Sequence, residues 1–174
     1  MTDGLRLRFL YGAMGLAAWL AYRVFGLRRA VIRGNLSRSF PDQSPERLRA
    51  LEREFGRRQG EVAAEALYAA TIGEEELRKR VVFLNPGILA PGTPPRPLIL
   101  VGAHHCNFEW VLQRLSLEMP GGFLCLYKPL RNARMDAWMR RLRTRFGARL
   151  IPAKSVLQEL ARSRDAVAVG LLAD

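Results

Sequence analysis

The sequence has few of the residues that form disulfides or bind transition metals. Two of its 174 residues are cysteine, Cys106 and Cys125, and they are not spaced as a CxxC pair. A disulfide framework is therefore excluded, and we expect two free thiols in a reducing compartment. The two histidines, His104 and His105, are adjacent. Because a zinc site needs three or four ligands and adjacent residues rarely chelate one ion, we expect no metal.

Lysine is also scarce, since only Lys79, Lys128 and Lys154 among the 28 basic residues are lysines. The net charge of +12 indicates an anionic partner, such as nucleic acid, an acidic protein, phosphate groups or a membrane surface. A GC-rich genome gives the same composition, so the total charge alone does not separate these interpretations. The apolar fraction of 49% excludes a disordered chain, and the sequence has no internal repeat.

The apolar run near the N-terminus is shorter than an ordinary membrane-spanning helix. It covers 14 residues, Phe9–Tyr22, whereas a spanning helix needs about 20. Arginines on both sides favour a helix held at the anionic cytoplasmic surface of a membrane. A buried core helix and a signal peptide are the alternatives, although arginine follows the run directly, where a signal peptide has small neutral residues.

The first eighty residues are predicted to be helical. Residues 1–40 form a basic anchor region, and residues 41–80 form a helical segment. Its long amphipathic helix begins with Ser44 as N-cap and Pro45 in the first turn, with Gly56 and Gly60 as weak positions. A short helix, "EEELRKR", follows with its acids first and its bases last, as the helix dipole favours.

The character of the chain changes after Lys79. The apolar runs predict strands, and the segments between them predict helices: strands at 81–84, 98–103, 123–127, 149–152 and 166–174, helices at 108–118, 133–146 and 154–163, and a proline-rich loop at 85–97. Strands that alternate with helices predict an α/β core over 81–174, a mostly parallel sheet covered by helices on both faces. Because the chain ends at Asp174 directly after an apolar strand, we expect this core to be incomplete at its C-terminus.

The stretch "VGAHHCNFEW" (101–110) carries the chemistry. His104 follows the carboxyl end of a predicted strand, where α/β sheets bind their ligands, and Asn107 is a natural N-cap for the next helix. On one helix, residues five apart point about 140° away from each other, so His104 and Glu109 meet only if the chain turns between them. A strand–turn–helix provides that turn. The carboxylate would then orient the imidazole, and the free nitrogen would take a proton from a substrate hydroxyl.

Three other interpretations of this stretch stay open on spacing alone. His104 could be a structural histidine at a strand end, it could help bind a metal, or Cys106 could be a nucleophile beside it. None of them has further support in the sequence, because no third metal ligand and no third member of a catalytic triad is evident.

The stretch resembles the HX4E block of the bacterial lipid A biosynthesis acyltransferases, the lauroyl/myristoyl transferase family, which typically reads G-H-[FY]-G-N-W-E. His104, Asn107 and Glu109 match it position for position. His105 stands at the aromatic position, and Cys106 replaces a glycine. The segments "RRAVIRGNLSRSFPDQSPERL" and "LYKPLRNARMDAWMRRLRTRFGARLIP" resemble two further blocks of the family in the same order, so the resemblance covers nearly the whole chain.

The resemblance implies a glycerolphosphate-acyltransferase-like fold and an O-acyltransferase at the cytoplasmic face of the cell inner membrane. An acyl chain would move from acyl carrier protein or coenzyme A to a hydroxyl of a lipid A precursor, with His104 as base and Glu109 as its partner. No cofactor beyond the acyl thioester is implied. The chain is shorter than is usual for the family, and we expect it to lack about the last third.

The segment 128–149 is rich in arginine and contains one acid, Asp136. Some of its basic groups are expected to hold lipid phosphates or acidic carrier protein, although a solvated helix face is the simpler interpretation for any single arginine. We expect the substrate-binding residues to be Asn107, Lys128, Arg143 and Arg145. Nucleic-acid binding is not expected, because the aromatic residues alternate with core-like aliphatic ones.

Two other functions therefore stay open beside lipid A acylation. The chain could acylate another membrane lipid, such as a phospholipid, aminolipid or glycolipid. It could also be a non-catalytic basic fragment that binds a membrane or nucleic acid.

Overall fold

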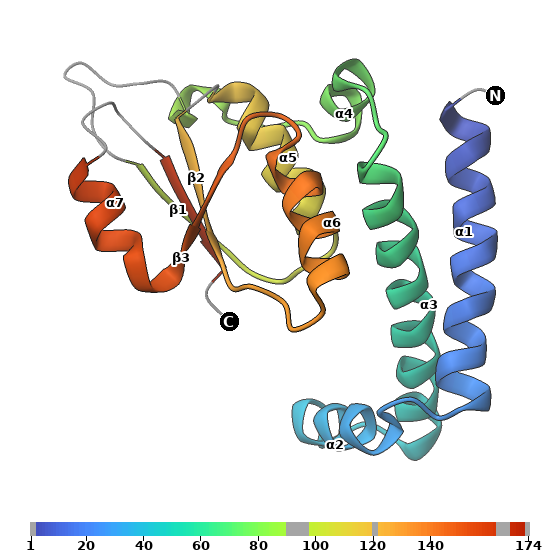
Figure 1. Ribbon diagram of the computed structural model, residues 1–174. Helices are drawn as coiled ribbons and strands as arrows, with labels where there is room; N and C mark the ends of the chain where they lie inside the picture. Colours follow the sequence, from blue (N-terminus) through green and yellow to red (C-terminus); the bar gives the residue numbers. More distant parts are fainter. Residues whose placement is uncertain (1–2, 90–97, 120–121, 163–167, 173–174) are drawn as a thin grey trace. The chain divides into compact units, whose positions relative to one another are not determined.

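The computed structural model describes residues 3–89, 98–119, 122–162 and 168–172. The chain divides into two compact units, 1–68 and 69–174, which are described separately. The helices, including one π-helical and two 3-10 segments, have the following bounds: α1 Asp3–Trp19, η1 Leu20–Val24, α2 Arg29–Ser39, α3 Pro45–Ala69, α4 Glu74–Arg80, η2 Pro86–Leu89, α5 Phe108–Glu118, α6 Ala133–Thr144, η3 Ala153–Ser155 and α7 Val156–Arg162. The strands are β1 Leu98–Gly102, β2 Phe123–Tyr127, β3 Arg149–Pro152 and β4 Ala168–Leu172 (Figure 1).

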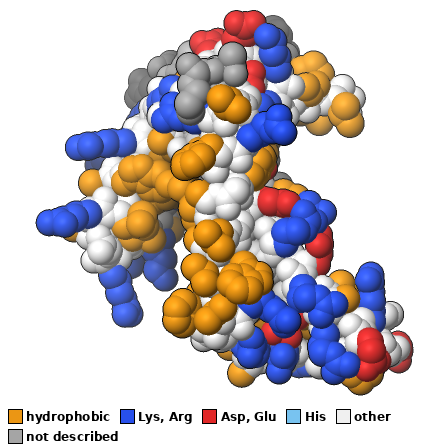
Figure 2. Space-filling model, turned by 90° about the vertical axis from the view of Figure 1, so that its right-hand side faces the viewer, with side chains coloured by type: hydrophobic (Ala, Val, Ile, Leu, Met, Phe, Trp, Pro, Cys, Tyr) orange, Lys and Arg blue, Asp and Glu red, His pale blue; other side chains and the backbone are white. Residues whose placement is uncertain are grey.

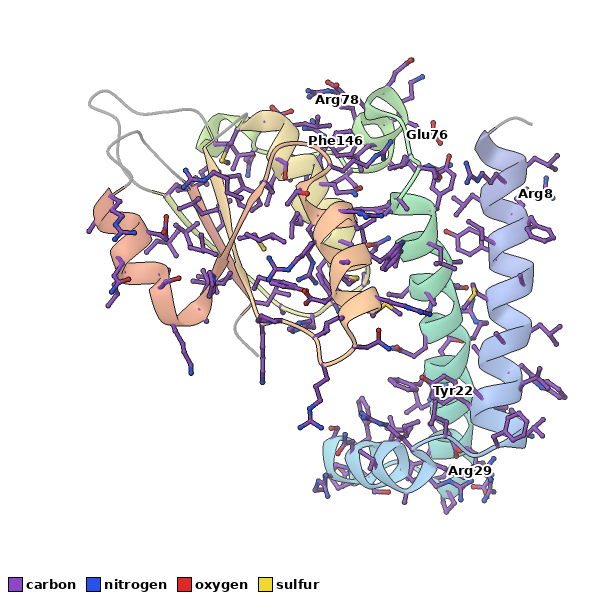
Figure 3. The ribbon with its side chains drawn as sticks, viewed as in Figure 1. Arg8, Tyr22, Arg29, Glu76, Arg78 and Phe146 are labelled. Atoms are coloured by element: carbon purple, nitrogen blue, oxygen red, sulfur yellow. The ribbon has the colours of Figure 1, made fainter. Side chains whose placement is uncertain are left out.

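The N-terminal unit is helical, as predicted, and the chain bends sharply between α1 and α2. The last turn of α1 widens into η1, and Gly26 then adopts a left-handed φ of 61°. The Leu27 N–H donates to the Ala21 carbonyl at 2.8 Å, one residue further back than in an ordinary Schellman end, as the wider π-helical turn allows. Arg29 donates to the carbonyls of Tyr22 and Arg23, so its guanidinium caps the end of η1 (Figure 3).

The helix α3 begins as predicted, since the Ser44 hydroxyl accepts from the Arg47 N–H at 3.3 Å and Pro45 is the first helical residue. Gly60 is a contact point rather than only a weak position. A Cβ there would lie 3.0 Å from the Ala18 Cβ and from the Met14 carbonyl, so the absence of a side chain lets α1 and α3 approach closely.

Among the described residues, no single helix is both long and apolar enough to cross a membrane. One pair of helical segments, 4–24 and 29–39, reaches the necessary length and composition only when taken together, and it is bent by 87°. Several large apolar side chains of the first of these segments are exposed: Leu5, Phe9, Leu16, Trp19, Leu20 and Val24. Figure 2 shows hydrophobic side chains gathered on the drawn face with basic side chains beside them.

The second unit is an α/β fold with a parallel four-stranded sheet in the order β1-β4-β2-β3, which confirms the predicted class. One face carries a core of Leu112, Phe123, Cys125, Ala148 and Ala168, and the other a core of Leu124, Ile151 and Val169. Covering is not complete on the second face. Ile99 and Val101 share that face with Val169 and Leu171, their register partners, and they are 63% and 66% exposed.

The strand predicted at Val81–Leu84 is wrong. This segment is irregular, with Val82 and Leu84 exposed, and none of the described strands pairs with it. Its attachment to α5 takes the place of strand pairing, because Arg114 donates to the Val81 carbonyl at 3.1 Å and lies over the Phe83 ring. The loop predicted at 85–97 contains the 3-10 turn η2, and residues 90–97 lie outside the described residues.

Candidate active site

His104 lies where the sequence predicts, directly beyond the carboxyl end of β1. The Ala103 carbonyl accepts from the His105 N–H at 2.7 Å, which closes a three-residue turn centred on His104. The imidazole is exposed and meets the Phe108 ring edge-on, with ring centroids 5.0 Å apart. The turn therefore places the imidazole at the surface, beside the first residue of α5.

The start of α5 also follows the prediction. The Asn107 side-chain oxygen accepts from the Trp110 N–H at 3.1 Å, so Asn107 is the N-cap. Glu109 lies in the first turn and is buried, with 6% of its surface exposed. A buried carboxylate needs a cation or several hydrogen-bond donors. Without them, removing its charge from water costs on the order of several kcal/mol.

Arg143 from α6 supplies that cation. Its Nε lies 3.0 Å and 3.2 Å from the two Glu109 carboxylate oxygens, and its Nη2 lies 2.5 Å from Oε1. The carboxylate that the sequence predicts as the partner of His104 is therefore bound by a cation from α6. Spacing within the HX4E block could not reveal this, because the partner lies 34 residues further along the chain.

Arg143 is held between aromatic rings as well as by the carboxylate. Its guanidinium carbon lies 5.4 Å from the Tyr127 ring centroid and 6.0 Å from that of Phe108. Burial by itself would lower the pKa of Arg143, but the hydrogen bonds and charge of Glu109 outweigh it and the pKa is raised. Arg143 therefore stays charged and connects α6 to the start of α5.

A second network fixes the segment between β2 and α6. The Asp136 carboxylate accepts from the Tyr127 hydroxyl, from the Leu130 N–H at 2.7 Å and from Arg140 at 2.8 Å. These donors, Tyr127 first, lower the pKa of Asp136 to about 2. Asn132 caps α6 by accepting from the N–H groups of the first turn. The polar residues of the family-like segment therefore set where α6 begins and so position Arg143.

The structure does not bring Arg145 to this site. Its guanidinium donates to the carbonyls of Ala69, the last residue of α3, and of Ile72, three residues further on. Gln113, fully buried on α5, donates to the Ala69 carbonyl as well, at 3.1 Å, and to the Leu142 carbonyl at 2.9 Å. Arg145 thus has a structural role in satisfying backbone acceptors, and nothing in its geometry supports the predicted contact with substrate.

A cavity of about 700 Å³ opens beside His104. Lys128, Arg143 and both histidines line it, so two of the predicted basic residues meet the predicted base here. The rest of its wall is mainly apolar and includes Leu100, Val111, Leu115, Phe123, Leu126 and Met139. A cavity of this size and polarity fits an apolar chain whose polar end lies near the imidazole.

Neither cysteine is bonded to the other. Cys125 lines the cavity wall, and burial raises the pKa of its thiol to about 11, so it stays protonated at neutral pH. Cys106 is exposed on the turn after His104. Among the described residues, no three His, Cys, Asp or Glu side chains lie close enough to share a metal ion.

The backbone at Cys106 is strained, and relief of this strain should change the stability of the chain. Cys106 has a φ of 51°, a left-handed conformation that costs a residue with a Cβ about 1–2 kcal/mol. We expect Cys106→Gly to raise the free energy of unfolding by about 0.5–1 kcal/mol, since glycine also loses more backbone entropy on folding. Urea denaturation measures this change. Cys106→Ala removes the thiol but keeps the Cβ, and an equal gain from alanine would contradict the explanation.

The second unit is thus an α/β protein with an exposed histidine at the edge of a parallel sheet, beside an apolar cavity. A family model for bacterial lipid A biosynthesis acyltransferases matches residues 7–174, and the chain belongs to that family. The resemblance seen in the sequence is confirmed, and the family identifies the chain as an acyltransferase of lipid A biosynthesis. No curated protein sequence matches the chain.

Proposed function

We propose that the chain transfers a fatty acyl group from a thioester, acyl carrier protein or coenzyme A, to a hydroxyl of a lipid A precursor at the cytoplasmic face of the inner membrane. The observation that carries the proposal is the position of His104. Its imidazole is exposed at the carboxyl end of β1 and lines a cavity whose wall is mainly apolar. Both the reacting hydroxyl and the acyl chain therefore have a place beside one base.

In the proposed reaction His104 removes the proton from the acceptor hydroxyl as its oxygen attacks the thioester carbonyl. A C–O bond forms and a tetrahedral intermediate results. This intermediate collapses with cleavage of the C–S bond, and the imidazolium returns its proton to the leaving thiolate. The products are an ester and a free thiol, so no redox partner is needed.

The remaining polar groups have proposed roles that follow from their contacts. Lys128 is exposed at the cavity and is suited to a phosphate or carboxylate of either substrate. Glu109 is held by Arg143, and we propose that this pair fixes the start of α5 and Phe108, against which the His104 ring lies. Asn107 acts through its cap of the same helix. Glu109 and Asn107 are therefore positioning residues.

The test is acyl transfer in a host that lacks late acylation of its lipid A. Expression of the chain is expected to add one acyl chain to lipid A, seen as a mass increase in extracted lipid A. Total lipid extracts from the same cells are analysed in parallel. An unchanged lipid A together with a newly acylated phospholipid, aminolipid or glycolipid would refute the proposed acceptor.

A further inference from the structure

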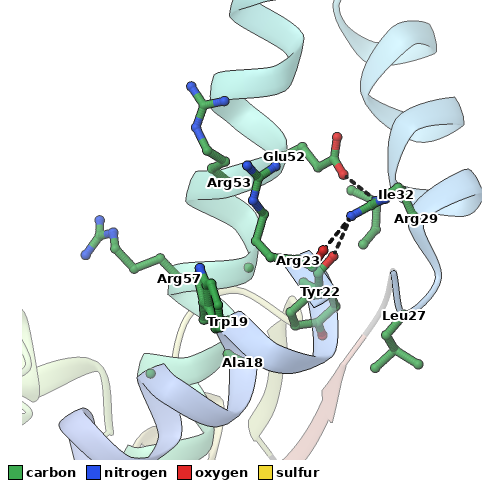
Figure 4. A pocket seen from close by; sticks show the side chains of 12 residues that line it. Ala18, Trp19, Tyr22, Arg23, Leu27, Arg29, Ile32, Glu52, Arg53 and Arg57 are labelled. Atoms are coloured by element: carbon green, nitrogen blue, oxygen red, sulfur yellow. Dashed lines mark hydrogen bonds and ion pairs between the residues drawn. The ribbon is translucent and has the colours of Figure 1, made fainter. Parts of the chain in front are cut away.

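The N-terminal unit has a cavity of its own. It measures about 420 Å³ and lies where the end of α1, η1, the start of α2 and the middle of α3 meet (Figure 4). Gly56 on α3 lines it, and a Cβ at residue 56 would be in ordinary contact with the Tyr22 side chain, at 3.4 Å. Tyr22 also meets Phe55 edge-on at 5.8 Å. The cavity is therefore built from packed residues of four helical segments, α1, η1, α2 and α3.

One side of this cavity is apolar and open to solvent. Trp19 and Leu27 line it with 55% and 50% of their surfaces exposed, and Ile32 and Ala18 add to the same wall. The exposed apolar residues Leu16, Leu20, Val24 and Phe25 lie within a few positions of Trp19 along the chain. An apolar chain could thus leave the cavity along a surface that already exposes apolar side chains to water.

The rest of the lining is basic and is only partly neutralised. Four arginines line the cavity, Arg23, Arg29, Arg53 and Arg57, against one acid, Glu52. Glu52 is shared by Arg29 at 3.3 Å and Arg33 at 2.8 Å. Arg57 is paired with Glu54 and Glu61, outside the lining.

Two cations remain at the cavity without a counter-charge. Among the described residues, the side chains of Arg23 and Arg53 form no hydrogen bond or ion pair, and both are exposed. Figure 4 shows both among the side chains that line the cavity, without a dashed line to either guanidinium group. Two unpaired guanidinium groups beside an indole and a leucine match a ligand with an anionic phosphate and an apolar chain.

We propose that this cavity binds an anionic membrane phospholipid. Arg23 and Arg53 hold its phosphate, and the start of one acyl chain lies against Trp19 and Leu27. Tryptophan is suited to this position because its ring has an apolar body and one N–H donor, as at membrane interfaces generally. The site shares no residue with the cavity at His104, so it goes beyond the proposed acyl transfer and gives the N-terminal unit a lipid contact of its own.

The test uses the whole chain and short-chain phosphatidylglycerol, kept below the concentration at which it forms micelles. The double variant Arg23→Gln/Arg53→Gln is expected to bind this lipid at least about tenfold more weakly, measured by titration calorimetry at physiological salt. The matched control is Arg8→Gln/Arg47→Gln, which removes one exposed arginine from α1 (Arg8, labelled in Figure 3) and one from α3, both outside the cavity. The control is expected to bind within twofold of the unchanged chain. An equal loss in both variants would overturn the site in favour of general charge attraction.

Two further measurements test whether both the phosphate and the acyl chain contribute to binding. Inorganic phosphate at millimolar concentration is expected not to displace the lipid. If phosphate competed as strongly as the lipid itself does, the apolar wall would make no contribution to binding. Gly15→Met adds a side chain at a lining position where a Cβ meets nothing within 4 Å. It leaves the charge unchanged and is expected to weaken lipid binding at least fivefold. Unchanged binding by this variant would show that the chain does not enter the cavity.

Discussion

Replacing His104 with alanine is expected to lower acyl transfer by roughly a hundredfold to ten-thousandfold, the range that a general base contributes. The imidazole is exposed on a turn, so its loss creates no cavity in the core and is expected to leave folding intact. Transfer is measured as the amount of newly acylated lipid A in the acylation-deficient host, at matched protein levels. Lipid A acylated as fully by this variant as by the unchanged chain would remove His104 from the mechanism.

His105 provides the matched control for this experiment. It is adjacent, also exposed, and lines the same cavity, but it is the neighbour of the proposed base rather than the base itself. Alanine at position 105 is expected to keep activity within about tenfold of the unchanged chain, a loss below the usual contribution of a general base. If His105→Ala were the more damaging of the two changes, the roles of the two histidines would have to be exchanged.

Replacing Arg143 with methionine is expected to lower the free energy of unfolding by about 3–5 kcal/mol, because it leaves the Glu109 carboxylate buried without its cation. The Glu109 side chain is 7% exposed and Arg143 16%, so water does not substitute readily for the guanidinium. Since a domain is stable by only about 5–15 kcal/mol, this loss should be visible in urea or thermal unfolding. A loss below about 1 kcal/mol would mean that the pair behaves as a surface ion pair.

A double variant identifies the unpaired carboxylate as the cause of this loss. In Glu109→Gln/Arg143→Met this pair leaves no buried charge, so stability is expected to recover in part and the two changes to be non-additive. The double variant still lacks the arginine stem, so a stability no higher than that of Arg143→Met would point instead to lost packing of that stem.

The sequence predicts the sheet and the helices of the α/β unit well because their patterns are local. Continuous apolar runs bounded by turn residues mark β1, β2, β3 and β4, and Asn107 marks the start of α5 as its N-cap. The strand prediction at Val81–Leu84 is wrong because it, too, rests on local composition alone. Its composition suits a strand, but a strand needs a neighbour, and tertiary contacts with Arg114 decide its conformation.

The site was harder to predict because its electrostatic contacts are distant in sequence. Glu109 finds Arg143 across 34 positions, and no spacing rule within one block gives that contact. The sequence predicts both Arg143 and Arg145 as substrate-binding residues. On a helix, residues two apart point about 200° away from each other, so both could not face α5 in one place. The sequence does contain one signal for this contact. A glutamate in the first turn of a helix that packs on the sheet is rarely buried unless it is paired, and the arginine-rich segment offers the partner.

The backbone acceptors at Ala69 and Ile72 decide where the α/β unit can be separated from the residues before it. Gln113 donates to the first and Arg145 to both, so these side chains depend on two residues that precede α4 rather than on the sheet alone. In a recombinant fragment that starts at α4, the Gln113 amide and the Arg145 guanidinium would lose these acceptors. A fragment that keeps at least the last turn of α3 retains their acceptors, and this is the boundary at which the unit should be cloned.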